Sequence, residues 1–284
     1  MNGIILIDKP KDYTSRDIVN IVGKSLNTKK VGHTGTLDPL ATGLLVVAIN
    51  DGLKIINLLN SDTKEYEVEV TLGTLTDTLD ITGTILKSDN NFKLNKDELE
   101  KILKSFLGKL IQEVPIYSAV KVKGKKLYEY ARNNEVVELP KKEIEIYNIR
   151  LTESNDNSFK FITTVSKGTY IRSLIRDIGL KLNILCTMSN LRRTKAGNFD
   201  IKDTITVDDI KAKNIKMIPV IDSLSNYKKI EVDSEFKKLI MNGRILENIY
   251  NDEIIVFTNN NQVIALYKIY DKDSTKIKPI KVFN

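Results

Sequence analysis

Residues 32–45 read Gly32-His33-Thr34-Gly35-Thr36-Leu37-Asp38-Pro39-Leu40-Ala41-Thr42-Gly43-Leu44-Leu45. This stretch places one carboxylate among three glycines, just before an apolar run. Glycine adopts positive φ at little steric cost, so the backbone here can turn sharply and let a partner approach closely. Pro39 fixes its own φ and favours an extended conformation at Asp38. A second interpretation is that Asp38 caps a short helical turn with Pro39 in the first helical position. These residues alone leave both interpretations open.

Five further segments follow in a fixed order. They are Lys64-Glu65-Tyr66, Thr76-Asp77-Thr78-Leu79-Asp80, Pro115-Ile116-Tyr117-Ser118-Ala119-Val120-Lys121, Ser166-Lys167-Gly168-Thr169-Tyr170-Ile171-Arg172 and Leu191-Arg192-Arg193. Together with the glycine-rich stretch, this ordered set resembles the TruB-type pseudouridine synthases, which modify the T-loop uridine (position 55) of transfer RNA. In that family the pattern G-H-T-G-x-L-D-P-x-A-x-G-x-L surrounds the catalytic aspartate.

The resemblance implies a catalytic set. Asp38 corresponds to the nucleophilic aspartate, and either attack on the sugar or proton abstraction is compatible with the sequence. Arg172 matches the arginine that pairs with it, and Asp80 is expected to help orient that arginine. Tyr66 matches the aromatic residue that stacks on the target base and takes part in proton transfer at C5. The pattern alone favours a core aromatic residue at Tyr66 and a surface arginine at Arg172.

Substrate-binding residues follow from the same resemblance. His33, the one histidine of the chain, matches the residue that fills the space vacated by a flipped base. Its alternative is a turn histidine bonded to local backbone. Tyr170 and Leu191 match positions that line the base pocket, and Tyr66 and Asp80 are counted with them. Lys121 belongs to a basic, aromatic segment, residues 115–127, that is typical of RNA binding but also of a solvated hairpin.

Composition restricts the chemistry. One histidine and one cysteine disfavour a zinc site, and an isomerisation adds and oxidises nothing, so we expect no metal and no cofactor. A net charge of +7 and a pI near 9.1 fit a polyanionic partner, although a lysine excess also serves solubility.

Hydrophobic patterns predict strands and helices in alternation. Strands are expected at 3–8, 44–49, 64–72, 142–152 and 158–166. Helices are expected after a cap at Thr14 or Ser15, behind the strand 44–49, from Asn95 until Gly108 ends it, and at 169–182. Residues 74–83 and the segment carrying His33 and Asp38 are expected to be loops. The resemblance implies an α+β fold with a mixed, mainly antiparallel sheet and flanking helices.

The last part of the chain predicts a separate unit. A helix at 234–241 and strands at 254–257 and 263–269 indicate a small β-rich domain, similar to the PUA-type domain that ends many family members. We therefore expect a catalytic domain over residues 1–225 and a PUA-like domain over 226–284.

The expected partner is the T-arm of tRNA. No run of about 18 apolar residues and no signal peptide is evident, so we expect no membrane contact and a cytoplasmic location. We also expect a monomer without an obligatory protein partner. The alternatives are a tRNA-binding folding helper and a pseudouridine synthase that acts on another RNA.

Overall fold

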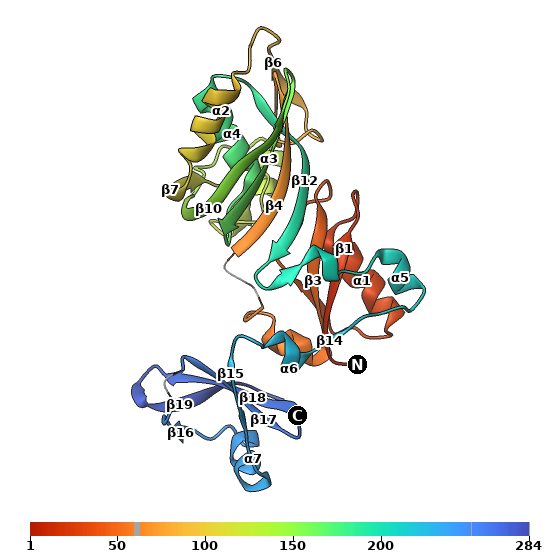
Figure 1. The fold of residues 1–284 in the computed structure, drawn as a ribbon, viewed down its shortest axis with the longest axis vertical. Coiled ribbons are helices and arrows are strands. Elements are labelled where there is room, and N and C mark those ends of the chain that lie inside the picture. Colours follow the sequence, from red (N-terminus) through yellow and green to blue (C-terminus); the bar gives the residue numbers. More distant parts are fainter. Residues whose placement is uncertain (60–62, 251, 284) are drawn as a thin grey trace.

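A computed structural model describes residues 1–59, 63–250 and 252–283, and one large sheet dominates it (Figure 1). Among these residues its ten strands are β1 (Gly3–Lys9), β2 (Val31–Thr34), β3 (Thr42–Ile49), β4 (Thr63–Leu72), β7 (Gly108–Glu113), β10 (Lys141–Ser154), β11 (Ser158–Ser166), β12 (Cys186–Ala196), β13 (Phe199–Asp200) and β14 (Ile218–Pro219). The order is β14-β1-β3-β12-β4-β11-β10-β7, with β2 beside β3 and β13 beside β12. Only β3 and β12 run parallel within it. The predicted mixed, mainly antiparallel sheet with flanking helices is confirmed.

The half of the sheet from β12 to β7 is covered on one face by α2 (Lys96–Lys104) and α4 (Ile171–Leu182) (Figure 1). Strand β4 alternates as predicted, and its apolar residues Tyr66, Val68, Val70 and Leu72 are buried. They pack with residues of both helices in one hydrophobic cluster. This period of two is what a strand with one covered face requires.

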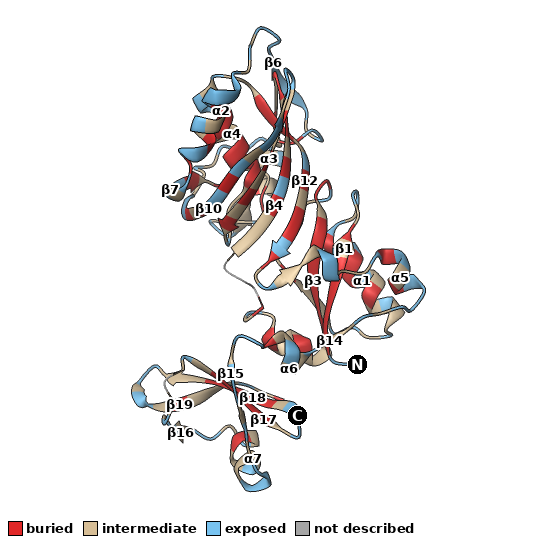
Figure 2. Ribbon diagram, in the orientation of Figure 1, coloured by how far each residue is buried: buried red, intermediate tan, exposed pale blue. Residues whose placement is uncertain are grey.

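The half around β1 and β3 is buried on both faces (Figure 2). Continuous apolar runs of this kind suit a strand that is covered on both faces. One face packs against α1 (Ser15–Ser25) and α5 (Val207–Lys211). Of the two expected caps, Thr14 begins α1, since its side chain accepts from the Asp17 amide in a capping box.

Residues from 228 onward form a second sheet, in the order β15-β17-β18-β19-β16. Its elements are β15 (Lys228–Glu231), α7 (Ser234–Met241), β16 (Leu246–Glu247), β17 (Ile254–Asn259), β18 (Gln262–Tyr270) and β19 (Asp273–Val282). The expected helix and two strands are confirmed, and β19 was not predicted. Val256, Leu266 and Phe283 pack in one cluster with Leu44 and Val46 of β3. The second sheet thus shares a hydrophobic cluster with β3, and α6 (Val220–Ser223) contacts both β1 and β18.

Shorter elements complete the chain. They are the hairpin β5 (Thr74–Thr76) with β6 (Ile85–Ser88), the hairpin β8 (Lys121–Val122) with β9 (Lys125–Lys126), α3 (Leu127–Arg132), the 3₁₀ helix η2 (Ile201–Asp203) and α6 (Val220–Ser223). None of the helices within the described residues is both long and apolar enough to span a membrane.

Four sequence predictions were wrong in detail. The helix expected behind β3 is a 3₁₀ helix, η1 (Asn50–Ile55), in which Gly52 packs against the backbone of Gly3. The helix after Asn95 ends at Lys104, and Gly108, with φ of 91°, opens β7 instead. His33 lies in β2, where it pairs with Val47, and not in a loop. The expected loop 74–83 begins with β5, because residues 74–76 pair with β6.

Candidate active site

Asp38 lies on residues 35–44, which join β2 to β3 and include the first three residues of β3; this stretch is hereafter called the Asp38 segment. Two glycines with positive φ shape it, Gly35 at 65° and Gly43 at 99°. A Cβ on Gly43 would overlap the Arg193 backbone, so the close approach of β3 to β12 requires glycine there. The Asp38 side chain remains 41% exposed. The glycine-rich stretch thus presents the carboxylate on a tightly packed backbone.

Groups near the N-terminus fasten this segment. The Ser15 hydroxyl accepts from the Leu37 amide at 3.0 Å and donates to the Leu37 carbonyl at 3.2 Å. The Asp12 amide donates to the Pro39 carbonyl at 2.9 Å. Lys9 Nζ donates to the same carbonyl at 3.3 Å and to the Tyr13 carbonyl at 2.6 Å. Bonds on both sides of Asp38 therefore limit its movement.

Asp38 forms an ion pair with Arg172, as the resemblance implied. The distance from Arg172 Nη2 to Asp38 Oδ2 is 2.9 Å, and the arginine side chain is only 9% exposed. Its remaining donors reach the Thr78 carbonyl at 3.0 Å and the Tyr117 carbonyl at 3.1 Å. The capping interpretation of Asp38 is not what the structure adopts, because the carboxylate faces a guanidinium. A buried arginine that two backbone carbonyls hold in place is a well-oriented counter-ion for a half-exposed carboxylate.

Asp80 lies on the other side of Arg172, at 3.8 Å from Nη1. It is 5% exposed, and its Oδ1 accepts from the hydroxyls of Thr78 and Thr82 and from the Thr82 amide. The adjacent Ile81 amide donates to the Met188 carbonyl at 3.0 Å and ties the loop to β12. Asp38, Arg172 and Asp80 thus form one charged row from three separate segments.

Apolar and aromatic groups surround this row. Tyr66 and Leu191, each 7% exposed, share a hydrophobic cluster with Leu37 and Leu40 of the Asp38 segment. Tyr66 is therefore a core aromatic residue beside the candidate site, and its stacking on the target base stays a prediction.

Tyr170 directly precedes α4. Gln112 fixes its backbone, since the Gln112 amide group accepts from the Tyr170 N–H at 2.8 Å and donates to its carbonyl at 3.1 Å. Burial raises the pKa of the Tyr170 phenol; the charge of Asp38 raises it further, while Arg172 lowers it. Tyr170 is therefore a protonated group within electrostatic range of the Asp38–Arg172 pair.

Two predicted residues lie outside this row. The His33 Nδ1 atom is buried and has no hydrogen-bond partner among the described residues, so the alternative of a local backbone bond is not seen at that nitrogen. Burial, followed by the charges of Arg193 and Arg16, lowers the pKa of His33. Lys121 is exposed on β8, and no contact between it and Asp38 occurs in the described part of the chain.

Sequence reasoning missed two buried cations of the site, Lys9 and Arg193. Lys9 is fully buried, and burial lowers its pKa to about 8 despite the opposing charge of Asp38. The feature that could have indicated Lys9 is its place at the end of an apolar strand, directly before a proline. For Arg193 it was an arginine within a quoted motif whose strand, β12, was not recognised. Within the described residues, no group of three or more acidic, histidine or cysteine side chains is arranged to hold a metal ion.

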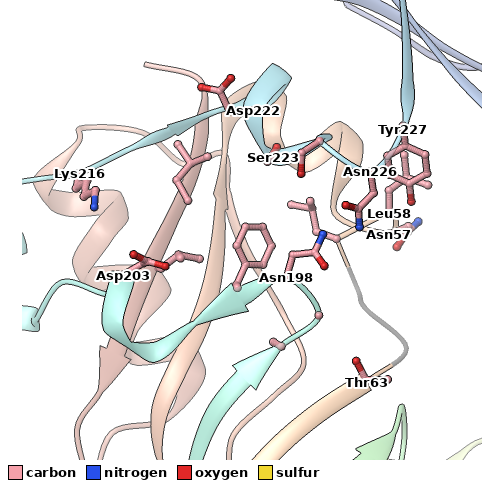
Figure 3. Close-up of a pocket in the computed structure, with 17 residues that line it drawn as sticks. Asn57, Leu58, Thr63, Asn198, Asp203, Lys216, Asp222, Ser223, Asn226 and Tyr227 are labelled. Carbon is pink, nitrogen blue, oxygen red and sulfur yellow. The ribbon is translucent and has the colours of Figure 1, made fainter.

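A cavity of about 680 Å³ lies elsewhere, between β13, residues 57–59 and the connection through α6 (Figure 3). Asn57, Asn198, Asp222 and Tyr227 are among the residues that line it. Its lining includes none of the predicted site residues. This cavity therefore lies beside the connection that leads to the second sheet and is separate from the candidate site.

Comparison with known families defines the class of the protein. The model of the N-terminal domain of TruB family pseudouridylate synthases matches residues 24–171, and that of the tRNA pseudouridylate synthase B C-terminal domain matches residues 172–219. The fold and these matches thus define the chain as a pseudouridylate synthase. More narrowly, the chain belongs to the TruB family.

Relatives and solved structures agree with this. A tRNA pseudouridine synthase B from Clostridium tetani is 42% identical over 274 residues, covering 94% of this chain and 95% of the relative. One from Oceanobacillus iheyensis is 42% identical over 297 residues, covering 100% of this chain and 98% of the relative. A chain of a solved Cbf5-Nop10-Gar1 complex is similar with a TM-score of 0.72 and 26% identity, covering 99% of this chain and 84% of that chain. A chain of an H/ACA ribonucleoprotein bound to a substrate RNA containing 2′-deoxyuridine is similar with a TM-score of 0.72 and 25% identity. The match covers 99% of this chain and 85% of that chain.

Proposed function

We propose that this protein converts the T-loop uridine of tRNA, position 55, to pseudouridine, with Asp38 as the nucleophile. The ion pair of a half-exposed Asp38 with a buried Arg172 is the observation that carries the proposal. The full-length relatives named tRNA pseudouridine synthase B support tRNA as the substrate.

The proposed reaction is an isomerisation in which no atom is gained or lost. The bond from ribose C1′ to the base nitrogen N1 breaks, the base turns, and a bond from C1′ to C5 forms. N1 gains a proton and C5 loses one. Asp38 attacks C1′ and holds the sugar while the base turns, and Arg172 orients the attacking carboxylate. Asp80 keeps Arg172 in place from the opposite side.

The base has to leave the stacked T-loop to reach Asp38, at a cost of a few kcal/mol. In the proposal Tyr66 stacks on the flipped base, and Tyr170 and Leu191 close the pocket around it. Tyr66 also serves the proton transfer at C5. A neutral His33 occupies the space that the base vacates, because an uncharged imidazole stacks on neighbouring bases without losing a hydrated charge.

The hairpin of β8 and β9 is proposed to bind the RNA backbone. Lys125 lies 4.7 Å from the Tyr130 ring centre and pairs with Glu135, so its charge is already engaged. Lys121 and Lys123 are exposed on the same hairpin. Exposed lysines gain affinity for RNA by releasing counterions from the phosphates.

The test is to incubate the purified chain alone with unmodified tRNA and to map pseudouridine at single-nucleotide resolution. We expect product at the T-loop uridine and nowhere else, which would also show that no other protein is needed. Tight binding without product would favour the folding-helper alternative. Product only in another RNA, or only with added partner proteins, would contradict the proposed substrate.

A further inference from the structure

Arg193 is a buried arginine on the face of β12 that lies toward the candidate site. It pairs with Tyr66 across the antiparallel ladder between β12 and β4. Directly paired residues of such a ladder project to the same face, and Tyr66 faces the cluster that holds Leu37 and Leu191. Arg193 is 1% exposed, so its side chain runs inside the protein beside the candidate site.

The guanidinium bonds to both ends of the Asp38 segment. Its Nε donates to the Leu44 carbonyl at 2.8 Å, and its Nη2 donates to the Gly35 carbonyl at 3.0 Å. Its Nη1 lies 3.2 Å from the place where Gly35 would carry a Cβ. The planar fork of a guanidinium holds two carbonyls in a fixed relation, which a single ammonium group does not reproduce.

Burying the charge of Arg193 without a counter-ion costs folding free energy, which suggests that the residue has a function. No carboxylate forms an ion pair with Arg193 among the described residues, and both of its acceptors are neutral carbonyls. A buried charge without a counter-ion destabilises a fold by several kcal/mol unless its donors are satisfied. Lys9 is a second buried cation, and it bonds to the Pro39 carbonyl near the middle of the same segment. Buried cations thus hold the Asp38 segment at Gly35, Pro39 and Leu44.

We propose that Arg193 is a positioning residue of this active site, whose forked contact with Gly35 and Leu44 fixes the Asp38 carboxylate opposite Arg172. The inference rests on the proposed function, because it assigns Arg193 to the step that Asp38 carries out. Arg193 touches no substrate; it acts through the backbone that bears Asp38.

Two variants separate the fork from the charge. Arg193→Lys keeps the positive charge but loses the fork, and Arg193→Met removes both. We expect Arg193→Lys to lower the single-turnover rate on tRNA about 10- to 100-fold, since a misplacement near 1 Å has an effect of this size, while the Kd for tRNA stays within about twofold. Arg176→Lys is the matched control, because that arginine is held by Glu113 and Asp177 and should keep its rate. A wild-type rate in Arg193→Lys, or a loss of tRNA affinity in proportion to the rate, would overturn the proposal.

The one histidine of the chain provides a readout independent of turnover. Because the Arg193 charge acts on His33, an NMR titration of its imidazole should give a higher pKa in Arg193→Met than in the wild type. Arg193→Lys should leave that pKa near the wild-type value although its rate falls. An unchanged His33 pKa in Arg193→Met would place the guanidinium elsewhere and overturn the proposal.

A measurement on the wild-type protein covers the case in which the variants do not fold. The Arg193 Nε–H, bonded to a buried carbonyl, should exchange slowly with water in a ¹⁵N spectrum. Rapid exchange would overturn the proposed contact with Gly35 and Leu44. If the wild-type chain forms no pseudouridine in tRNA, the proposed function fails, and this exchange rate still decides the geometry.

Discussion

The protein uses positive charge in two different ways, in the Asp38 site and in the β8–β9 hairpin. In the site, Lys9, Arg172 and Arg193 are buried and bonded to backbone carbonyls or to Asp38. In the hairpin, Lys121 and Lys123 are exposed at the surface, beside Lys125 and Lys126, which lie over tyrosine rings. Buried charges interact strongly and are screened little by salt, whereas surface charges are weak individually and salt-sensitive. The first group therefore suits catalytic geometry and the second suits RNA affinity.

The largest effect expected from the site is that of Asp38→Asn. The variant keeps the size of the side chain but loses the nucleophile, so pseudouridine formation should fall below detection while tRNA binding stays near the wild-type level. Single-turnover assays and filter binding on the same protein measure both. Full turnover in this variant would disprove the role of Asp38.

Substitution of Arg172 should be the next largest. Arg172→Lys keeps one charge but loses the bonds to Thr78 and Tyr117, so the carboxylate is less well oriented. We expect a rate decrease of about 100-fold with unchanged tRNA affinity. A loss of affinity without a loss of rate on bound tRNA would instead move Arg172 from the site to the docking surface.

Lys9 predicts opposite trends of activity and stability with pH. Its folded pKa of about 8 lies below the ordinary value of 10.5, so between these values the unfolded chain binds more protons. Lys9 then makes the free energy of unfolding rise with pH across that window, by at most about 1.4 kcal/mol per pH unit. Activity should fall about tenfold over the same window, because Lys9 loses the charge it places beside the Asp38 segment. Thermal unfolding and single-turnover rates from pH 7 to 10 measure both trends, and Lys9→Met should lack the contribution to stability. Identical pH profiles of unfolding in the two proteins would contradict the assignment.

The smallest effect is expected from the hairpin. Lys121→Ala and Lys123→Ala should each weaken tRNA binding severalfold and reduce the slope of log Kd against log salt by about 0.7 to 0.9. The rate on bound tRNA should not change. Lys104→Ala, on the exposed end of α2, is the control. If it weakens binding equally, the hairpin has no special part in docking.

The same contrast explains what the sequence predicted. Strand β4 was found because its period of two reflects one covered face, and Asp38 and Arg172 were paired because their motifs match a family. Strand β12 was missed because Ser189, Asn190 and Arg192 interrupt any apolar period, although it lies in the centre of the sheet. Its polar residues find partners from distant segments, such as Asp8 for Arg192 at 2.7 Å, and local patterns carry no record of those.

Strand β19 was missed for a related reason. It contains Pro279, which normally argues against a strand, and the ladder tolerates it because a register shift lies beside it, between Leu266 and Tyr267. The roles of Lys9 and Arg193 were missed as well, because a charged residue suggests a surface position until its burial is known.

The hydrophobic cluster that β3 shares with the second sheet also has a consequence for protein synthesis. Leu44 and Val46 leave the ribosome early, but Val256 and Leu266, which belong to the same cluster, follow roughly 200 residues later. At about 5–20 residues per second, the delay lasts about 10–40 s. During that time the cluster is incomplete, and apolar surface exposed on a nascent chain is prone to aggregate. A protein shortened before Val256 would keep its active-site residues and stay in that condition permanently.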